Sequence, residues 1–182
     1  VQDQPIRKPD KVRAFANLPD DPAMRAGLDW EAARGWLDYL PGGALNIAYE
    51  AVDRHVAHGR RTREAIRWLG RDGSTRSLTY GELKAATDRF ARVLGRLGHD
   101  KGVRVFSLLG RIPELYIAAL GTLKAGGVFC PLYSAFGPEP VRARMTIGEA
   151  EVLVTTAVDY ARKVLPWRGE LPCLKHVLLV DA

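Results

Sequence analysis

The sequence predicts an α/β fold in which helices alternate with the strands of a mostly parallel sheet. Four short apolar runs recur along the second half of the chain, and a segment with helical spacing separates each run from the next. Strands that are apolar on both faces are typical of a parallel sheet with helices on both sides. A hydrophobic content of 47% and a charged content of 26% agree with a folded domain. The four predicted strands are residues 103–109, 128–132, 151–156 and 176–180.

The N-terminal region predicts little packed structure. Residues 1–28 are rich in Pro, Asp and Lys and have few periodic apolar positions, which indicates an arm on the surface. Residues 28–40 have the pattern of a short amphipathic helix around Trp30, and a Pro-Gly-Gly run follows it. We therefore expect an N-terminal arm and short helix over 1–44, and an α/β region over 45–182.

A helix and a hairpin are predicted before the sheet. Asn46 is a suitable N-cap for a helix that Gly59 ends. Residues 64–79 form two alternating runs around a glycine-containing turn, which predicts a β-hairpin. Thr79 and Glu82 have the spacing of a capping box, in which each side chain bonds the other residue's amide. The helix that follows is predicted to end at Gly98 and to bury Leu83, Ala86, Phe90, Val93, Leu94 and Leu97.

The stretch from Lys124 to Pro140 is rich in glycine and proline, which raises the question of a phosphate-binding loop. A helix is predicted over 113–126, and Gly126 and Gly127 fall where it must end and the next strand begin. A phosphate loop has the opposite order, with a strand first, then glycines, a Lys and a helix. We therefore interpret these glycines as a helix terminus.

The loop over 133–140 leads from a predicted strand into a predicted helix over 138–145, and a further helix is predicted over 158–165. Pro138 and Glu139 suit a helix N-terminus that can face an anion. The loop has no Lys and a single glycine, so the binding signal is weak.

No pattern for catalysis or metal binding occurs in the sequence. It contains neither the G-x-G-x-x-G fingerprint of dinucleotide sites nor a nucleophile elbow. The histidines lack metal-ligand spacing, so we expect them at the surface or at helix ends. They are His55, His58, His99 and His176.

Composition limits the compartment and the partners. The formal charge is +6, but the basic residues are scattered without interleaved aromatic residues, so no nucleic-acid partner is expected. Cys130 and Cys173 lie far apart among apolar neighbours, which favours buried, reduced thiols in a reducing compartment. The longest uncharged run, 125–138, is too short to cross a membrane, and no signal peptide is seen. We expect a cytoplasmic protein with no membrane partner.

Four segments, taken in order, resemble the beginning of AMP-forming acetyl-CoA synthetases, which belong to the adenylate-forming acyl-CoA synthetase superfamily. The run Tyr-Glu-Ala-Val-Asp-Arg-His at 49–55 and the run Pro-Leu-Tyr-Ser-Ala-Phe-Gly-Pro-Glu at 131–139 are specific to the acetyl-CoA synthetase branch. The resemblance extends from about Trp30 to Asp181. The segments are 45–55, 78–98, 101–145 and 150–156.

The resemblance implies that 45–182 is the first part of a large AMP-binding domain, truncated at its C-terminal end. It implies that the full-length protein converts acetate, ATP and CoA to acetyl-CoA, AMP and pyrophosphate through an acetyl-adenylate, with Mg²⁺. The family's ATP-handling motifs are not in these residues, so the missing remainder of the chain is an implied partner. The apolar strand at the end of the sequence, with nothing to cover its edge, also indicates part of something larger. We expect the segment alone to bind none of these ligands and to be inactive, with no catalytic or metal-binding residue of its own.

The resemblance also implies a CoA site. In the family, the turn after the run Pro-Leu-Tyr-Ser-Ala-Phe at 131–136 lies near the path of the pantetheine. This indicates Ala135, Phe136 and Gly137 as CoA-site residues. Some members hold the CoA phosphates with arginines on a loop further along, and Arg162 and Lys163 stand there in this sequence. The arginine–glycine pattern of those members is absent, so a solvated helix face is the alternative interpretation of these two residues.

Two other functions stay open at this point. The full-length protein can be a ligase for another short-chain or medium-chain acid, because the residues that size the acyl pocket are expected downstream. The chain can also be a non-catalytic α/β binding module that shares the fold.

Overall fold

The computed structural model describes residues 9, 27 and 29–181. Its contacts divide the chain into two compact units, 1–38 and 39–182. Most of the arm that we predicted over 1–28 therefore lies outside the described residues. The boundary that we expected after residue 44 stays a prediction.

The first unit contains one short described helix, α3 (Trp30–Arg34). The Asp29 carboxylate caps it by accepting a hydrogen bond from the Glu31 amide at 3.0 Å. The predicted helix over 28–40 is thus too long, because the helix ends before Gly35. A helix of one turn gains little from its own hydrogen bonds, and Trp30 is 77% exposed, so no buried apolar face extends it.

The second unit is built on a four-stranded parallel sheet, which confirms the predicted fold class. The strand order is β4-β3-β5-β6. Each strand lies within or next to a predicted apolar run, and the central pair carries only buried residues except at Arg104. The bounds are β3 (Arg104–Leu108), β4 (Val128–Leu132), β5 (Val152–Thr155) and β6 (His176–Leu179).

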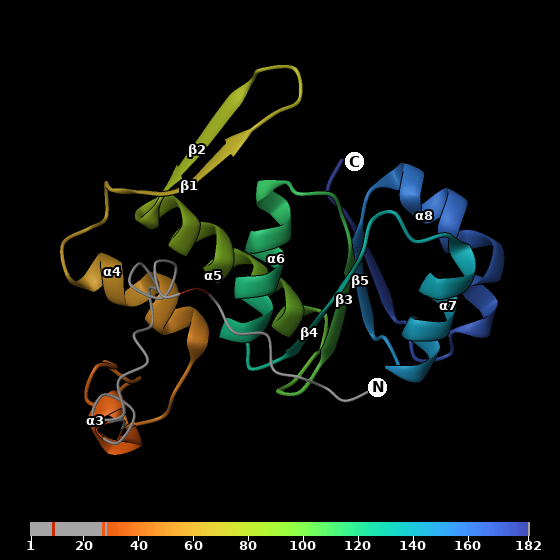
Figure 1. The fold of residues 1–182 in the computed structure, drawn as a ribbon. Coiled ribbons are helices and arrows are strands. Elements are labelled where there is room, and N and C mark those ends of the chain that lie inside the picture. Colours follow the sequence, from red (N-terminus) through yellow and green to blue (C-terminus); the bar gives the residue numbers. More distant parts are fainter. Residues whose placement is uncertain (1–8, 10–26, 28, 182) are drawn as a thin grey trace. The chain divides into compact units, whose positions relative to one another are not determined.

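Helices cover both faces of this sheet, as Figure 1 shows. On one face α5 (Tyr80–Arg96) and α6 (Pro113–Lys124) pack over a core of Val105, Val152 and Val154. On the other face lie α7 (Pro138–Ile147), α8 (Ala157–Lys163) and the 3₁₀ helix η2 (Leu165–Glu170). The core on this side includes Phe106, Leu108, Leu153, Met145 and Trp167.

The segments before α5 also follow the prediction. The Asn46 side chain accepts hydrogen bonds from the amides of Ala48 and Tyr49, at 3.0 and 3.1 Å, so it caps the helix that it was expected to begin. That helix has a widened π-helical turn, η1 (Tyr49–Asp53), which leads into α4 (Arg54–Ala57). The hairpin follows as β1 (Glu64–Leu69) and β2 (Thr75–Thr79).

The capping box of α5 is confirmed. The Glu82 amide donates to the Thr79 hydroxyl at 3.2 Å, and the Thr79 amide donates to the Glu82 carboxylate at 2.8 Å. Gly98 follows the helix at a φ of 79°, which suits a glycine at a helix terminus. One predicted core residue is wrong, because Val93 is 39% exposed.

The glycine pair between α6 and β4 ends the helix, as we interpreted it. The amides of Gly126 and Gly127 donate to the carbonyls of Leu123 and Thr122 at 3.0 and 2.9 Å. Gly126 has a φ of 74°, and a Cβ on Gly127 would lie 2.9 Å from the Val103 carbonyl oxygen. Both glycines are therefore required by the turn and by its closeness to β3.

An ion-pair network connects η1, α5 and α6. Lys124 Nζ lies 2.7 Å from carboxylate oxygens of both Asp53 and Asp88. Lys84 Nζ joins the same two carboxylates at 3.1 and 2.7 Å. Because all four side chains are no more than about one third exposed, the network contributes to the packing of these helices.

Candidate functional site

The carboxyl edge of the sheet is the place where a ligand site is expected. In open α/β sheets, ligands bind outside the carboxyl ends of the strands, at the point where the chain reverses its direction of winding. Here the chain places β4 on one side of β3 and β5 on the other, so the reversal lies between β3 and β5. The loops that follow β3 and β4, and the start of α8 after β5, meet at this edge.

The turn over 135–137 has one anchored residue and two accessible ones. The Phe136 ring packs against the core and lies below the Arg144 guanidinium, which is 4.4 Å from its centroid. The Tyr133 ring meets Phe136 edge to face at 5.6 Å. Ala135 and Gly137 are exposed. Of the three residues that we predicted at a CoA site, Phe136 therefore fixes the turn, and the other two form its open surface.

Lys163 is brought to this turn, 29 residues away in sequence. Its Nζ donates to the Ser134 carbonyl oxygen at 2.7 Å and forms an ion pair with Asp159 at 2.8 Å. The side chain is only 18% exposed. Lys163 thus holds the backbone of the loop after β4, and its ammonium group already has a carboxylate and a carbonyl partner.

Arg162 is arranged differently from its neighbour. It is exposed, and within the described part of the chain no carboxylate pairs with it. The start of α8 is fixed nearby, since the Thr156 hydroxyl accepts from the Asp159 amide and the Asp181 carboxylate accepts from the Ala157 amide. Of the two predicted cations, only Arg162 is free to meet an anion.

A hollow of about 580 Å³ lies beside the same edge, between the hairpin and the loops after β3 and β4. The Trp68 indole donates to the Arg111 carbonyl oxygen at 2.7 Å, and Arg76 pairs with Glu114, so the hairpin is attached to the start of α6. Sequence reasoning missed this wall, although Arg111 follows an apolar strand, which is where site residues are expected. The hollow is lined by Trp68, Leu69, Arg71, Gly110, Arg111, Ile112, Tyr133 and Ser134.

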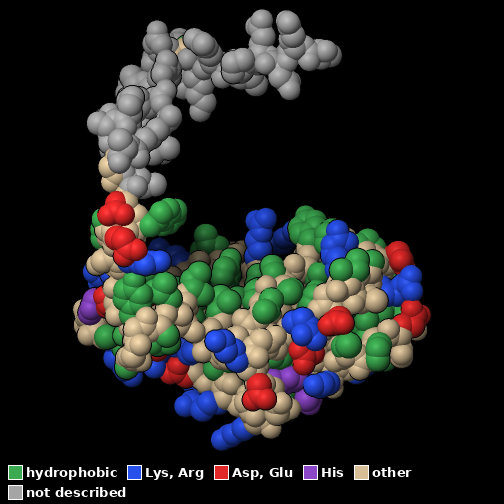
Figure 2. Space-filling view, turned by 90° about the horizontal axis from the view of Figure 1, so that it is seen from below, with side chains coloured by type: hydrophobic (Ala, Val, Ile, Leu, Met, Phe, Trp, Pro, Cys, Tyr) green, Lys and Arg blue, Asp and Glu red, His purple; other side chains and the backbone are tan. Residues whose placement is uncertain are grey.

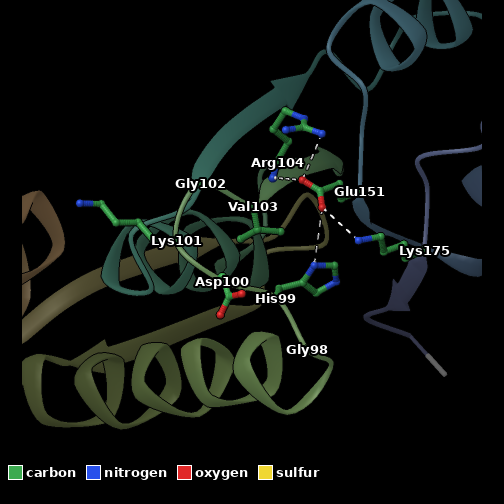
Figure 3. A pocket seen from close by; sticks show the side chains of 9 residues that line it. All are labelled: Gly98, His99, Asp100, Lys101, Gly102, Val103, Arg104, Glu151 and Lys175. Carbon is green, nitrogen blue, oxygen red and sulfur yellow. Dashed lines mark hydrogen bonds and ion pairs between the residues drawn. The ribbon is translucent and has the colours of Figure 1, made fainter.

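A second polar cluster lies at the opposite, amino edge of the sheet and is drawn in Figure 3. Glu151 is its centre: a carboxylate oxygen lies 3.2 Å from Arg104 Nη2, and the other lies 3.5 Å from Lys175 Nζ and 3.9 Å from His99 Nδ1. Burial by itself would raise the pKa of Glu151, but the Arg104 amide and the two cations lower it.. The carboxylate is therefore the anion that these cations share.

The histidines of this cluster correct one expectation. We predicted His99 at the surface or at a helix end, and it does follow the end of α5, but its side chain is only 2% exposed. It contacts His176, which begins β6. The sequence contains no signal for this contact, because 77 residues separate the two rings.

Several other kinds of site are not found in the part of the chain that the structure describes. No three His, Cys, Asp or Glu side chains gather as metal ligands. No described helix is both long and apolar enough to cross a membrane. Cys130 and Cys173 are unpaired but only partly buried, which corrects the expectation that both thiols are buried. Partial burial raises the pKa of the Cys130 thiol. On the face drawn in Figure 2, Lys and Arg side chains are scattered and do not gather in one patch.

Residues 53–182 match the family model described as AMP-binding enzyme. The chain belongs to this family. Its relatives include the acetyl-coenzyme A synthetases of Bacillus subtilis, 37% identical over 84% of this chain and 26% of the relative, and of Rubrobacter xylanophilus, 39% identical over 70% and 20%. The sequence-based resemblance to the adenylate-forming acyl-CoA synthetases is thereby confirmed.

Solved structures agree with the AMP-binding assignment. A Brucella canis acyl-CoA synthetase superposes with a TM-score of 0.74 at 27% identity, covering 86% of this chain and 28% of that one. An anthranilate CoA ligase shares the fold, with a TM-score of 0.66 at 20% identity over 75% and 25% of the two chains. The chain spans roughly a quarter of the length of these relatives.

Proposed function

We propose that this chain is the N-terminal segment of an acetate–CoA ligase that forms AMP. The observation that carries the proposal is the 37% identity to an acetyl-coenzyme A synthetase over 84% of the chain. The parallel sheet and its helices, which match a solved acyl-CoA synthetase, support it.

The proposed reaction has two steps. An acetate oxygen attacks the α-phosphorus of ATP, the bond to the β-phosphate oxygen breaks, and acetyl-AMP and pyrophosphate form. The CoA thiol loses its proton to solvent and its sulfur attacks the acetyl carbonyl carbon. AMP then leaves with the bonding electron pair, and acetyl-CoA forms. When Mg²⁺ is bound, it neutralises charge on the phosphates. We assign no catalytic or metal-binding residue of this chain to either step.

What this chain contributes is part of the surface that receives CoA. The exposed positions Ala135 and Gly137 offer little side chain to obstruct a narrow pantetheine arm. Arg162 supplies a guanidinium without a partner among the described residues, and guanidinium groups bind phosphates in bidentate geometry. Lys163 acts on the ligand indirectly, because it positions the loop after β4.

The test is acetate-dependent release of pyrophosphate from ATP. We expect no turnover and no micromolar ATP binding by the 182-residue chain. We expect turnover and acetyl-CoA formation by the product of the genomic reading frame that contains these codons. Turnover by the short chain, or no turnover of acetate by the longer product, would contradict the proposal.

A ligase for another short-chain or medium-chain acid is the second candidate, favoured by the structural match to a protein described only as an acyl-CoA synthetase. The same assay with propionate, butyrate and hexanoate separates the two. A non-catalytic binding module is supported if CoA binds while no acid gives turnover. In each case we propose a cytoplasmic protein whose partners are small molecules and the remainder of its own chain.

A further inference from the structure

Two histidine side chains meet at the amino edge of the sheet, away from the proposed CoA surface. His99 Nε2 lies 3.0 Å from His176 Nδ1, which is a hydrogen-bond distance, and the rings meet edge to face. His99 follows α5, and His176 begins β6 at one edge of the sheet. The contact therefore joins the end of a helix to an edge strand. Because the His99 side chain is 2% exposed, water cannot easily replace it.

The surroundings of His99 do not favour extra positive charge. The Glu151 carboxylate, the nearest anion, is 3.9 Å from His99 Nδ1 and is already shared with two cations (Figure 3). Three cationic and two carboxylate side chains line the pocket at the amino edge of the sheet, in which His99 lies. They are Asp100 and Lys101 after α5, Arg104 from β3, Glu151 before β5 and Lys175 before β6.

We propose that His99 and His176 form a proton-sensitive latch between α5 and β6. A neutral pair has one N–H between the two facing nitrogens. A first proton can bind an outer ring nitrogen and leave that hydrogen bond intact. A second proton puts an N–H on both facing nitrogens, so two donors oppose each other at 3.0 Å and the rings must separate. The pair therefore holds one proton while it is closed and two only when it is open.

The direction of the pH effect follows from this count. Burial, and then the charge of His176, lower the pKa of His99 below its usual value. In the unfolded chain each histidine takes up its proton near pH 6.5. The unfolded chain then binds more protons than the folded one, so the stabilisation from the latch is present above that pH and is lost as the pH falls. Below about pH 6.5, where the folded chain binds one proton fewer than the unfolded chain, the folding equilibrium constant falls about tenfold for each unit by which the pH is lowered.

Urea unfolding of the 182-residue chain at about pH 7.5 and about pH 5.5 tests the latch. His99→Gln and His176→Asn keep a polar atom near the position of the bonded nitrogen and do not titrate. We expect the wild-type folding constant to fall about tenfold more than that of His99→Gln over this interval. His176→Asn should keep part of the wild-type loss, because His99 stays buried in that variant. His55 also has a pKa lowered by burial, but it contributes equally to all three proteins.

A second measurement does not depend on the variants being folded. Nitrogen NMR of the wild-type imidazole rings should show that His99 and His176 together take up one proton over the same interval while the chain stays folded. Independent protonation of both rings with their contact intact would overturn the proposal. So would a loss of stability in His99→Gln as large as that in the wild type. Neither result bears on ligase activity, so the latch and the proposed function succeed or fail separately.

Discussion

At the scale of single residues, two adjacent cations on α8 have different physical roles. Lys163 is mostly buried and binds a carboxylate and a backbone carbonyl, whereas Arg162 is exposed and has no partner in the described part of the chain. A mostly buried ammonium group with two polar partners contributes to the shape of a site, because removing it leaves those partners unsatisfied. An exposed guanidinium contributes little to folding and is available for a ligand.

Lys163→Met and Arg162→Met form a matched pair that tests this difference. Lys163→Met leaves the Ser134 carbonyl and the Asp159 carboxylate without their donor, so we expect a loss of about 1–3 kcal/mol of unfolding free energy. Arg162→Met should change it by less than about 0.5 kcal/mol. Urea unfolding measures both. Equal effects would mean that Lys163 does not hold the loop.

At the scale of elements, the contact between α5 and α6 depends on a close approach at Gly121. A Cβ added to Gly121 would lie 2.8 Å from Cβ and Cδ1 of Phe90, closer than carbon atoms approach without displacement. The helix pair lies under one face of the sheet, so a shift there is transmitted to the core around Val105.

Gly121→Ala is therefore expected to destabilise the chain by about 1–3 kcal/mol, because the core must accommodate the added methyl group. Gly95→Ala is the control. Gly95 lies in α5 with nothing within 4 Å of the added Cβ, and alanine stabilises an exposed helix position by about 0.5 kcal/mol. Thermal or urea unfolding should give opposite signs. The same sign for both changes would contradict the packing argument.

Elements whose ends depend on local chemistry could be predicted from the sequence. The Thr79 capping box and the termini at Gly98 and Gly126 require only neighbouring residues, and all were found. What could not be predicted depends on distant segments. The His99 contact requires the sheet order that places β6 near the end of α5, and the bond from Lys163 requires the path of the loop after β4. Spacing within one helix contains neither kind of information.

At the scale of the whole molecule, charge is arranged in two partly buried networks, so acid should act on folding in two stages. The stabilisation from the histidine latch is lost at mildly acidic pH, and the stabilisation from the paired carboxylates is lost at lower pH. Burial by itself would raise the pKa of Asp88, but hydrogen bonds from Lys124 and Lys84 lower it below the usual value. The stabilisation from a carboxylate with a lowered pKa is present above its unfolded-state value and is lost as the pH falls through its folded-state value.

Asp88→Asn tests the second stage. The network joins η1, α5 and α6, so removing one charge leaves Lys124 and Lys84 sharing only Asp53. We expect a loss of about 1–2 kcal/mol at neutral pH and a flatter fall in stability below about pH 4, since one carboxylate no longer titrates. Glu31→Gln, which removes a 74% exposed carboxylate of the first unit, should leave the profile unchanged, because exposed pairs contribute little. Urea unfolding at a series of pH values measures both profiles, and an unchanged slope below pH 4 in Asp88→Asn would show that this network does not govern the acid response.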